Sequence, residues 1–110
     1  MKTYDPAADA RDAAAGRPDR PATALVHDAP GARLVVFRIA PGQAVAVHTS
    51  PSTVVMHVLS GSGLLSGAEG EREVGAGTVA VYEPGEPHGM RAAATEMVLL
   101  AAITPRPPSR

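Results

Sequence analysis

Two stretches of the 110-residue chain decide its fold: Gly42-Gln-Ala-Val-Ala-Val-His48-Thr-Ser50 and Gly77-Thr-Val-Ala-Val-Tyr-Glu83-Pro-Gly85-Glu-Pro-His88. Each stretch begins at a glycine, continues as a short valine-containing run and carries a histidine at or near its end. Glycine permits the tight turns from which strands start, and valine favours the pleated backbone of a strand. The two stretches therefore predict two equivalent units of turn, strand and histidine in one β domain.

The pattern of short β-prone runs extends over most of the chain. Gly and Pro separate the runs, and no long helical period lies between them. Many short strands at regular spacing predict an all-β sandwich or barrel. We expect strands over residues 24–27, 33–39, 44–48, 54–59, 63–66, 72–74, 78–82 and 96–103.

The two ends of the chain differ in composition from the middle. Residues 1–22 are rich in Ala, Asp, Arg and Pro and carry few large apolar side chains, which predicts a flexible N-terminal arm. Residues 105–110 contain three prolines, which fix φ and restrict the residue before them, so an extended C-terminal tail is expected. The β domain is therefore expected over residues 23–104.

Composition narrows the classes of partner. The formal net charge is -1, and the interspersed charges form no basic patch of the kind that nucleic acid needs. No apolar run approaches the roughly 20 residues that span a bilayer, and the N-terminus lacks the apolar core of a signal peptide. The sequence predicts a soluble cytoplasmic protein that binds neither nucleic acid nor membrane. Because cysteine is absent, metal ligands and catalytic groups must come from other side chains.

The glycine and histidine spacings resemble the two motifs of the cupin superfamily. Gly42, His48 and Gly61 match the first motif, and Gly77, Gly85 and His88 match the second. The resemblance implies an all-β double-stranded β-helix, the jelly-roll barrel of small cupins. It covers most of the chain beyond the N-terminal arm.

The family's metal-ligand set is depleted in this sequence. The resemblance implies three histidines and one glutamate as ligands, but Ser50 stands at the second histidine position and Val54 at the glutamate position. Only His48 and His88 remain as expected metal ligands. An implied divalent metal (Fe, Mn, Zn, Cu or Ni) would need further ligands, because its affinity depends on a nearly complete shell.

Strand alternation predicts which side chains share the barrel interior with the histidines. It places Ala44 and Ala46 on the face of His48. It also turns His57 away from the interior, while His27 is expected at the surface and Glu83 at the solvated mouth. A compact organic ligand is expected to contact His48, Ser50, Val54, Met56, His88 and Met90.

These residues favour a small cupin that binds a compact organic ligand in the barrel, with or without a weakly coordinated divalent metal. One alternative is a metal-dependent cupin enzyme of the dioxygenase or isomerase type. A second is a non-catalytic, dimeric structural or interaction protein. A homodimer is expected to form through the face opposite the interior, which by alternation carries Val45, Val47, Val55 and Leu59.

Overall fold

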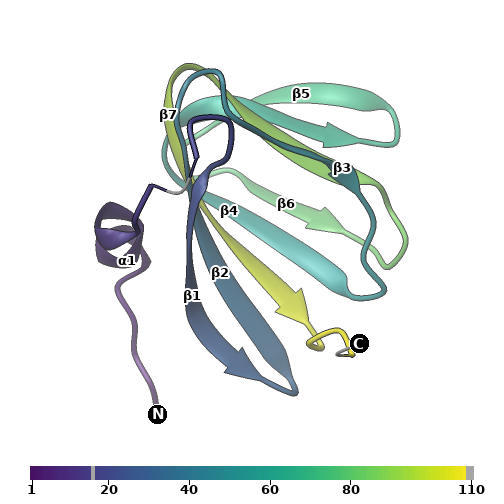
Figure 1. Cartoon of the computed structure of the whole chain (residues 1–110). Coiled ribbons are helices and arrows are strands. Elements are labelled where there is room, and N and C mark those ends of the chain that lie inside the picture. Colours follow the sequence, from purple (N-terminus) through teal and green to yellow (C-terminus); the bar gives the residue numbers. More distant parts are fainter. Residues whose placement is uncertain (16, 109–110) are drawn as a thin grey trace.

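The structure is a computed structural model that describes residues 1–15 and 17–108. It is built from antiparallel strands with one short helix (Figure 1). This architecture confirms the predicted all-β jelly-roll class. The elements, in chain order, are α1 (Pro6–Asp12), β1 (Ala22–Ala29), β2 (Ala32–Ile39), β3 (Ala44–His48), β4 (Thr53–Gly67), β5 (Gly70–Gly75), β6 (Val79–Tyr82) and β7 (His88–Thr104).

Two long strands, β4 and β7, run through both sheets of the jelly roll. The first sheet contains β1, β2, the C-terminal half of β7, the N-terminal half of β4, and β6. The second sheet contains β3, the N-terminal half of β7, the C-terminal half of β4, and β5. In Figure 1 the first sheet fans out below the second.

The sequence predicted two separate strands over 54–59 and 63–66, whereas β4 is continuous through both. Gly61 and Gly63 lie where its register shifts against β7. Gly61 adopts a φ of 73°, and a Cβ there would collide with the Glu96 carbonyl oxygen; one at Gly63 would collide with the Arg91 carbonyl oxygen. Glycines at these positions predict a break between strands, whereas in the structure they allow one strand to bend closely past its neighbour.

The main hydrophobic core lies between the two sheets. Val54, Met56 and Val58 alternate along β4 and are all buried, as their period of two predicts. They meet Leu65 and Met90 from the second sheet. Since both sheets contribute to one core, the side chains that close the barrel come from distant parts of the sequence.

The predicted N-terminal arm contains a helix that packs on the outer face of the first sheet. Asp5 caps α1 by accepting a hydrogen bond from the Ala8 backbone N–H. Ala10 is buried against Val26 and Val36 of that sheet. The Arg38 guanidinium donates to the carbonyl oxygens of residues 10, 11 and 13, which satisfies orphan acceptors at the helix end. This docking was not expected, because small alanines rather than large apolar residues make the contact.

The C-terminal tail folds back on the hairpin formed by β1 and β2. The Arg106 side chain donates to Asp28, and its backbone N–H donates to the Pro30 carbonyl oxygen. The Ser52 hydroxyl donates to the Pro105 carbonyl oxygen. These contacts hold residues 105–107 beside the barrel, whereas residues 109–110 of the predicted tail and residue 16 of the predicted arm lie outside the described residues.

The one helix of the described residues is too short to cross a bilayer.

Candidate functional site

The two histidines of the opening motifs face each other across neighbouring strands. His48 at the end of β3 is the register partner of His88 at the start of β7. Their ring centroids lie 4.3 Å apart at an interplanar angle of 63°. The two matching sequence units thus bring their histidines together, as the sequence predicts.

Both rings are fixed by the same local hydrogen bond. The Nδ1 atom of His48 lies 2.9 Å from the Ala46 carbonyl oxygen, and that of His88 lies 3.0 Å from the Glu86 carbonyl oxygen. A carbonyl oxygen only accepts, so Nδ1 carries the hydrogen in each ring. In its neutral form each imidazole therefore keeps a lone pair on Nε2.

The two imidazoles differ in exposure. His48 is exposed, whereas His88 is 3% exposed and lies between His48 and Tyr82, whose ring centroid is 5.1 Å away. Burial lowers the pKa of His88 below its usual value of 6.5; the nearby His48 adds to the lowering and the Glu86 carbonyl opposes it. His88 is therefore favoured in its neutral form near pH 7.

The two imidazoles border a cavity of about 290 Å³, which we call the histidine cavity. All six residues predicted to contact a ligand line it, although their binding role stays a prediction. Its wall is mainly apolar. The lining residues are Phe37, His48, Thr49, Ser50, Pro51, Val54, Met56, His88, Met90, Ala101, Ile103 and Pro107.

Several wall residues were not identified from the sequence. Phe37, Ala101 and Ile103 come from the middle of the first sheet, and Pro107 comes from the folded-back tail. Period-two alternation along β2 and β7 could have shown that Phe37 and Ala101 point inward. Only the register between strands shows that they meet at the two histidines.

The predicted shared face of Ala44, Ala46 and His48 is wrong. The register of β3 against β7 shifts between Val45 and His48, because this part of β3 has one residue more than the stretch of β7 that it faces. Val45 therefore pairs with Met90 and packs against the main core, on the same side as His48. Consequently Val45 cannot belong to the predicted dimer face.

The other candidate side chains lie away from the histidine cavity. His57 on β4 is exposed, consistent with the face that alternation gave it. His27 is hydrogen-bonded through Nδ1 to the Tyr4 hydroxyl at 2.8 Å. Glu83 is exposed in the loop before His88. None of these three side chains lines the histidine cavity.

The protein ligands of the predicted metal site are incomplete. Within residues 1–15 and 17–108, no group of three or more His, Cys, Asp or Glu side chains is placed to hold a metal ion. Catalytic zinc sites use three protein ligands and structural ones use four, whereas His48 and His88 supply two. This donor set does not fit a resident catalytic metal, so an ion would take most of its ligands from solvent or from a bound molecule.

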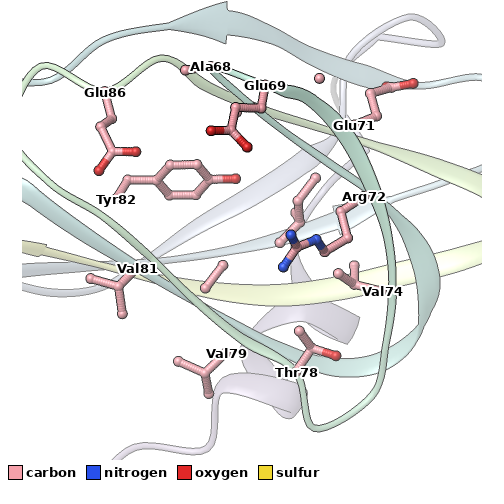
Figure 2. A pocket seen from close by; sticks show the side chains of 14 residues that line it. Ala68, Glu69, Glu71, Arg72, Val74, Thr78, Val79, Val81, Tyr82 and Glu86 are labelled. Atoms are coloured by element: carbon pink, nitrogen blue, oxygen red, sulfur yellow. The ribbon is translucent and has the colours of Figure 1, made fainter.

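A second hollow, of about 520 Å³, opens between β5 and β6 and has Tyr82 in its wall (Figure 2). Its rim carries the carboxylates of Glu69 and Glu86 beside the tyrosine ring and the guanidinium of Arg72. The Tyr82 hydroxyl donates to the Ser66 carbonyl oxygen at 2.8 Å. Tyr82 thus lines this hollow while its ring lies close to His88, which lines the histidine cavity.

Comparisons with solved structures place this architecture among known proteins. TT1209 from Thermus thermophilus is 28% identical, with a TM-score of 0.85 over 97% of this chain and 100% of that chain. An RmlC-like cupin protein from Desulfovibrio desulfuricans is 29% identical, with a TM-score of 0.79 over 96% and 97%. A predicted oxalate decarboxylase from Thermotoga maritima is 19% identical, with a TM-score of 0.73 over 78% and 81%, a likeness of fold alone.

A search of curated proteins finds no significant match. The family model described as the cupin domain matches residues 35–104, which contain both histidine motifs and most of the strands. The chain therefore belongs to the cupin family.

Proposed function

We propose that this cupin binds a compact, largely apolar organic molecule in the histidine cavity, with His48 and His88 as its polar anchors. One observation carries the proposal: two imidazoles, each fixed through Nδ1 by a backbone carbonyl, lie side by side in a mainly apolar cavity. A pocket with an apolar wall and a few oriented polar groups is typical of small-molecule sites. The apolar wall would supply affinity, and the imidazoles would orient the ligand.

A metal-dependent enzyme is the alternative within the same cavity. Cupins often bind transition metals, and the solved structures with this fold include a predicted oxalate decarboxylase. Dioxygenase or isomerase chemistry would require the bound organic molecule and water to complete the shell of an Fe, Mn, Zn, Cu or Ni ion. The two-histidine donor set supports ligand binding more directly than this alternative.

Metal analysis combined with ligand binding separates the two proposals. The protein would be purified without chelator or nickel affinity, as wild type and as His48→Ala, His88→Ala and His57→Ala, the last as a matched control on the outer face of β4. We expect less than stoichiometric metal in all four proteins, and naphthalene, a compact apolar probe, to bind in calorimetric titration. Stoichiometric metal that disappears in the His48 and His88 variants but not in the His57 variant would favour the enzyme. Absence of binding by naphthalene and by its polar derivatives of the same size would contradict the ligand-binding proposal.

We further propose that two copies associate through the outer face of β6 and β4. Val79 and Val81 are each 56% exposed on β6, and Val81 is the register partner of the partly buried Val55. Of the face predicted from sequence, Val55 remains in this patch and Val47 is exposed elsewhere, on β3. Leu59 packs instead against the small hydrophobic cluster beneath α1. Burying such a strand face in a symmetric contact would shield its apolar area.

Sedimentation velocity tests the homodimer. We expect the wild type to sediment as a dimer and Val81→Lys to shift it toward monomer, because a lysine there would bury an unpaired charge. Val47→Lys is the matched control, being similarly exposed at 58% but on β3. A monomeric wild type at working concentration would remove this proposal.

A further inference from the structure

The hydrogen bonds of the two histidines restrict what the histidine cavity can recognise. In both rings the Nδ1 hydrogen is already donated to a backbone carbonyl oxygen. No hydrogen bond within residues 1–15 and 17–108 uses either Nε2 atom. Among these residues every buried side-chain nitrogen or oxygen atom has a hydrogen-bond partner. Because the Nε2 atom of His88 has none, that atom is accessible, and His88 lines the histidine cavity. A neutral ring therefore presents a hydrogen-bond acceptor to a ligand.

The charges around the histidine cavity also favour an uncharged ligand. No Lys, Arg, Asp or Glu occurs among the side chains that line it in the described chain. A carboxylate or phosphate would enter without a fixed cationic partner, and burying an unpaired charge is strongly unfavourable.

Ser50 offers a further polar contact in the cavity. Its hydroxyl oxygen accepts a hydrogen bond from the Ser52 backbone N–H at 3.1 Å. The hydroxyl hydrogen can still donate, so Ser50, like the Thr49 hydroxyl that also lines the cavity, adds a side-chain donor beside the imidazole acceptors. A ligand oxygen that both donates to an imidazole and accepts from Ser50 would match this arrangement, as a hydroxyl group does.

We propose that the ligand is an uncharged molecule whose hydroxyl or N–H group donates a hydrogen bond to the Nε2 of His48 or His88, while its compact apolar body fills the cavity. This inference rests on the proposed ligand-binding function. The volume of about 290 Å³ limits the body, since a cavity of about 150 Å³ is known to hold benzene. A molecule with about two fused rings is therefore near the upper size.

A matched series of probes tests the hydrogen-bond requirement. Calorimetric titration at pH 7.5 would compare naphthalene, 2-naphthol, 2-methoxynaphthalene and 2-naphthoate on the full chain. We expect 2-naphthol to bind about tenfold more tightly than 2-methoxynaphthalene, the effect of one buried hydrogen bond, and 2-naphthoate to bind most weakly. The preference for 2-naphthol should disappear in the double variant His48→Ala/His88→Ala and persist in His57→Ala.

The outcomes distinguish this inference from the proposed function beneath it. Equal binding of 2-naphthol and its methyl ether, or tightest binding of 2-naphthoate, would overturn the hydrogen-bond inference while leaving the cavity a binding site. Failure of all four probes, naphthalene included, would overturn the binding function itself.

Nitrogen-15 NMR of the histidine rings gives a readout that needs no ligand. We expect both His48 and His88 to show a protonated Nδ1 and an unprotonated Nε2 at pH 8. Assignment would use the single variants His48→Ala and His88→Ala, whose folding is checked by the strand signal in far-UV circular dichroism. The opposite tautomer in both rings would overturn the inference even if the probes bind.

Discussion

At the scale of single residues, His48 and His88 are register partners on neighbouring strands and supply imidazole groups to the wall of the histidine cavity. Each ring is oriented by the carbonyl oxygen two residues before it, so the two motifs repeat one local arrangement. Ser50 and Val54 stand where the family pattern has metal ligands, and both line the cavity. They contribute a hydroxyl group and an apolar side chain to its wall.

The lowered pKa of His88 predicts how stability depends on pH. Because burial makes the folded pKa lower than the unfolded value of about 6.5, the unfolded state binds the proton more readily below that pH. The contribution is thus fully present above pH 6.5 and is lost as the pH falls through the folded pKa, with a slope of at most about 1.4 kcal/mol per pH unit. Urea unfolding of wild type and His88→Gln between pH 4.5 and 8 measures this difference.

His57→Gln is the control for that comparison, since His57 is exposed on the same protein. It should keep the pH dependence of the wild type, whereas His88→Gln should flatten it. Wild-type protein that gains stability relative to His88→Gln as the pH falls would show that the fold favours protonated His88 instead.

At the scale of elements, the bend of β4 depends on glycine at position 61. We expect Gly61→Ala to lower the free energy of unfolding by about 2 kcal/mol or more, because a Cβ would be strained at a φ of 73° and would collide with the Glu96 carbonyl oxygen. Gly31→Ala is the matched control, since a Cβ there has no heavy-atom neighbour within 4 Å. Chemical denaturation of both variants checks the prediction; similar losses in the two would contradict it.

The C-terminal tail is the element that completes the histidine cavity through Pro107. We expect Arg106→Ala to release the tail from Asp28 and to weaken binding of naphthalene by about twofold to fivefold, the effect of losing part of one apolar wall. Hydrogen exchange should become faster at the backbone amide of residue 106, which in the wild type donates to the Pro30 carbonyl oxygen. Arg72→Ala, which alters the hollow between β5 and β6, should change neither quantity.

At the scale of the whole molecule, β4 and β7 tie the two sheets into one unit. Both strands contribute side chains to the core between the sheets, so neither sheet can lose its packing alone. We expect a single cooperative unfolding transition in urea. Far-UV circular dichroism and the NMR signals of His88 should give coincident midpoints, and a separation of the two curves would indicate that one sheet unfolds first.

The all-β class and the pair of histidines could be predicted from the sequence. Alternating apolar residues in β4 and glycine turns between short runs fix the all-β class, because each requirement is local to a few neighbouring residues. The spacing of glycine and histidine in the two motifs identifies the cupin fold and the pair His48 and His88. The contact between His48 and His88 could therefore be inferred, and so could the presence of the apolar side chains of Val54 and Met56 beside them.

Tertiary structure alone decided what surrounds that pair. The bulge in β3 that turns Val45 inward depends on pairing with β7, and alternation within one strand does not contain that information. The histidine cavity is lined by Phe37, Ala101 and Pro107, which come from segments far apart in the sequence. The helix α1 packs through the small side chain of Ala10, so its sequence shows no pattern of large apolar residues. The sequence determined the strands and the two histidines through local preference, whereas strand register and packing across the sheets determined the cavity.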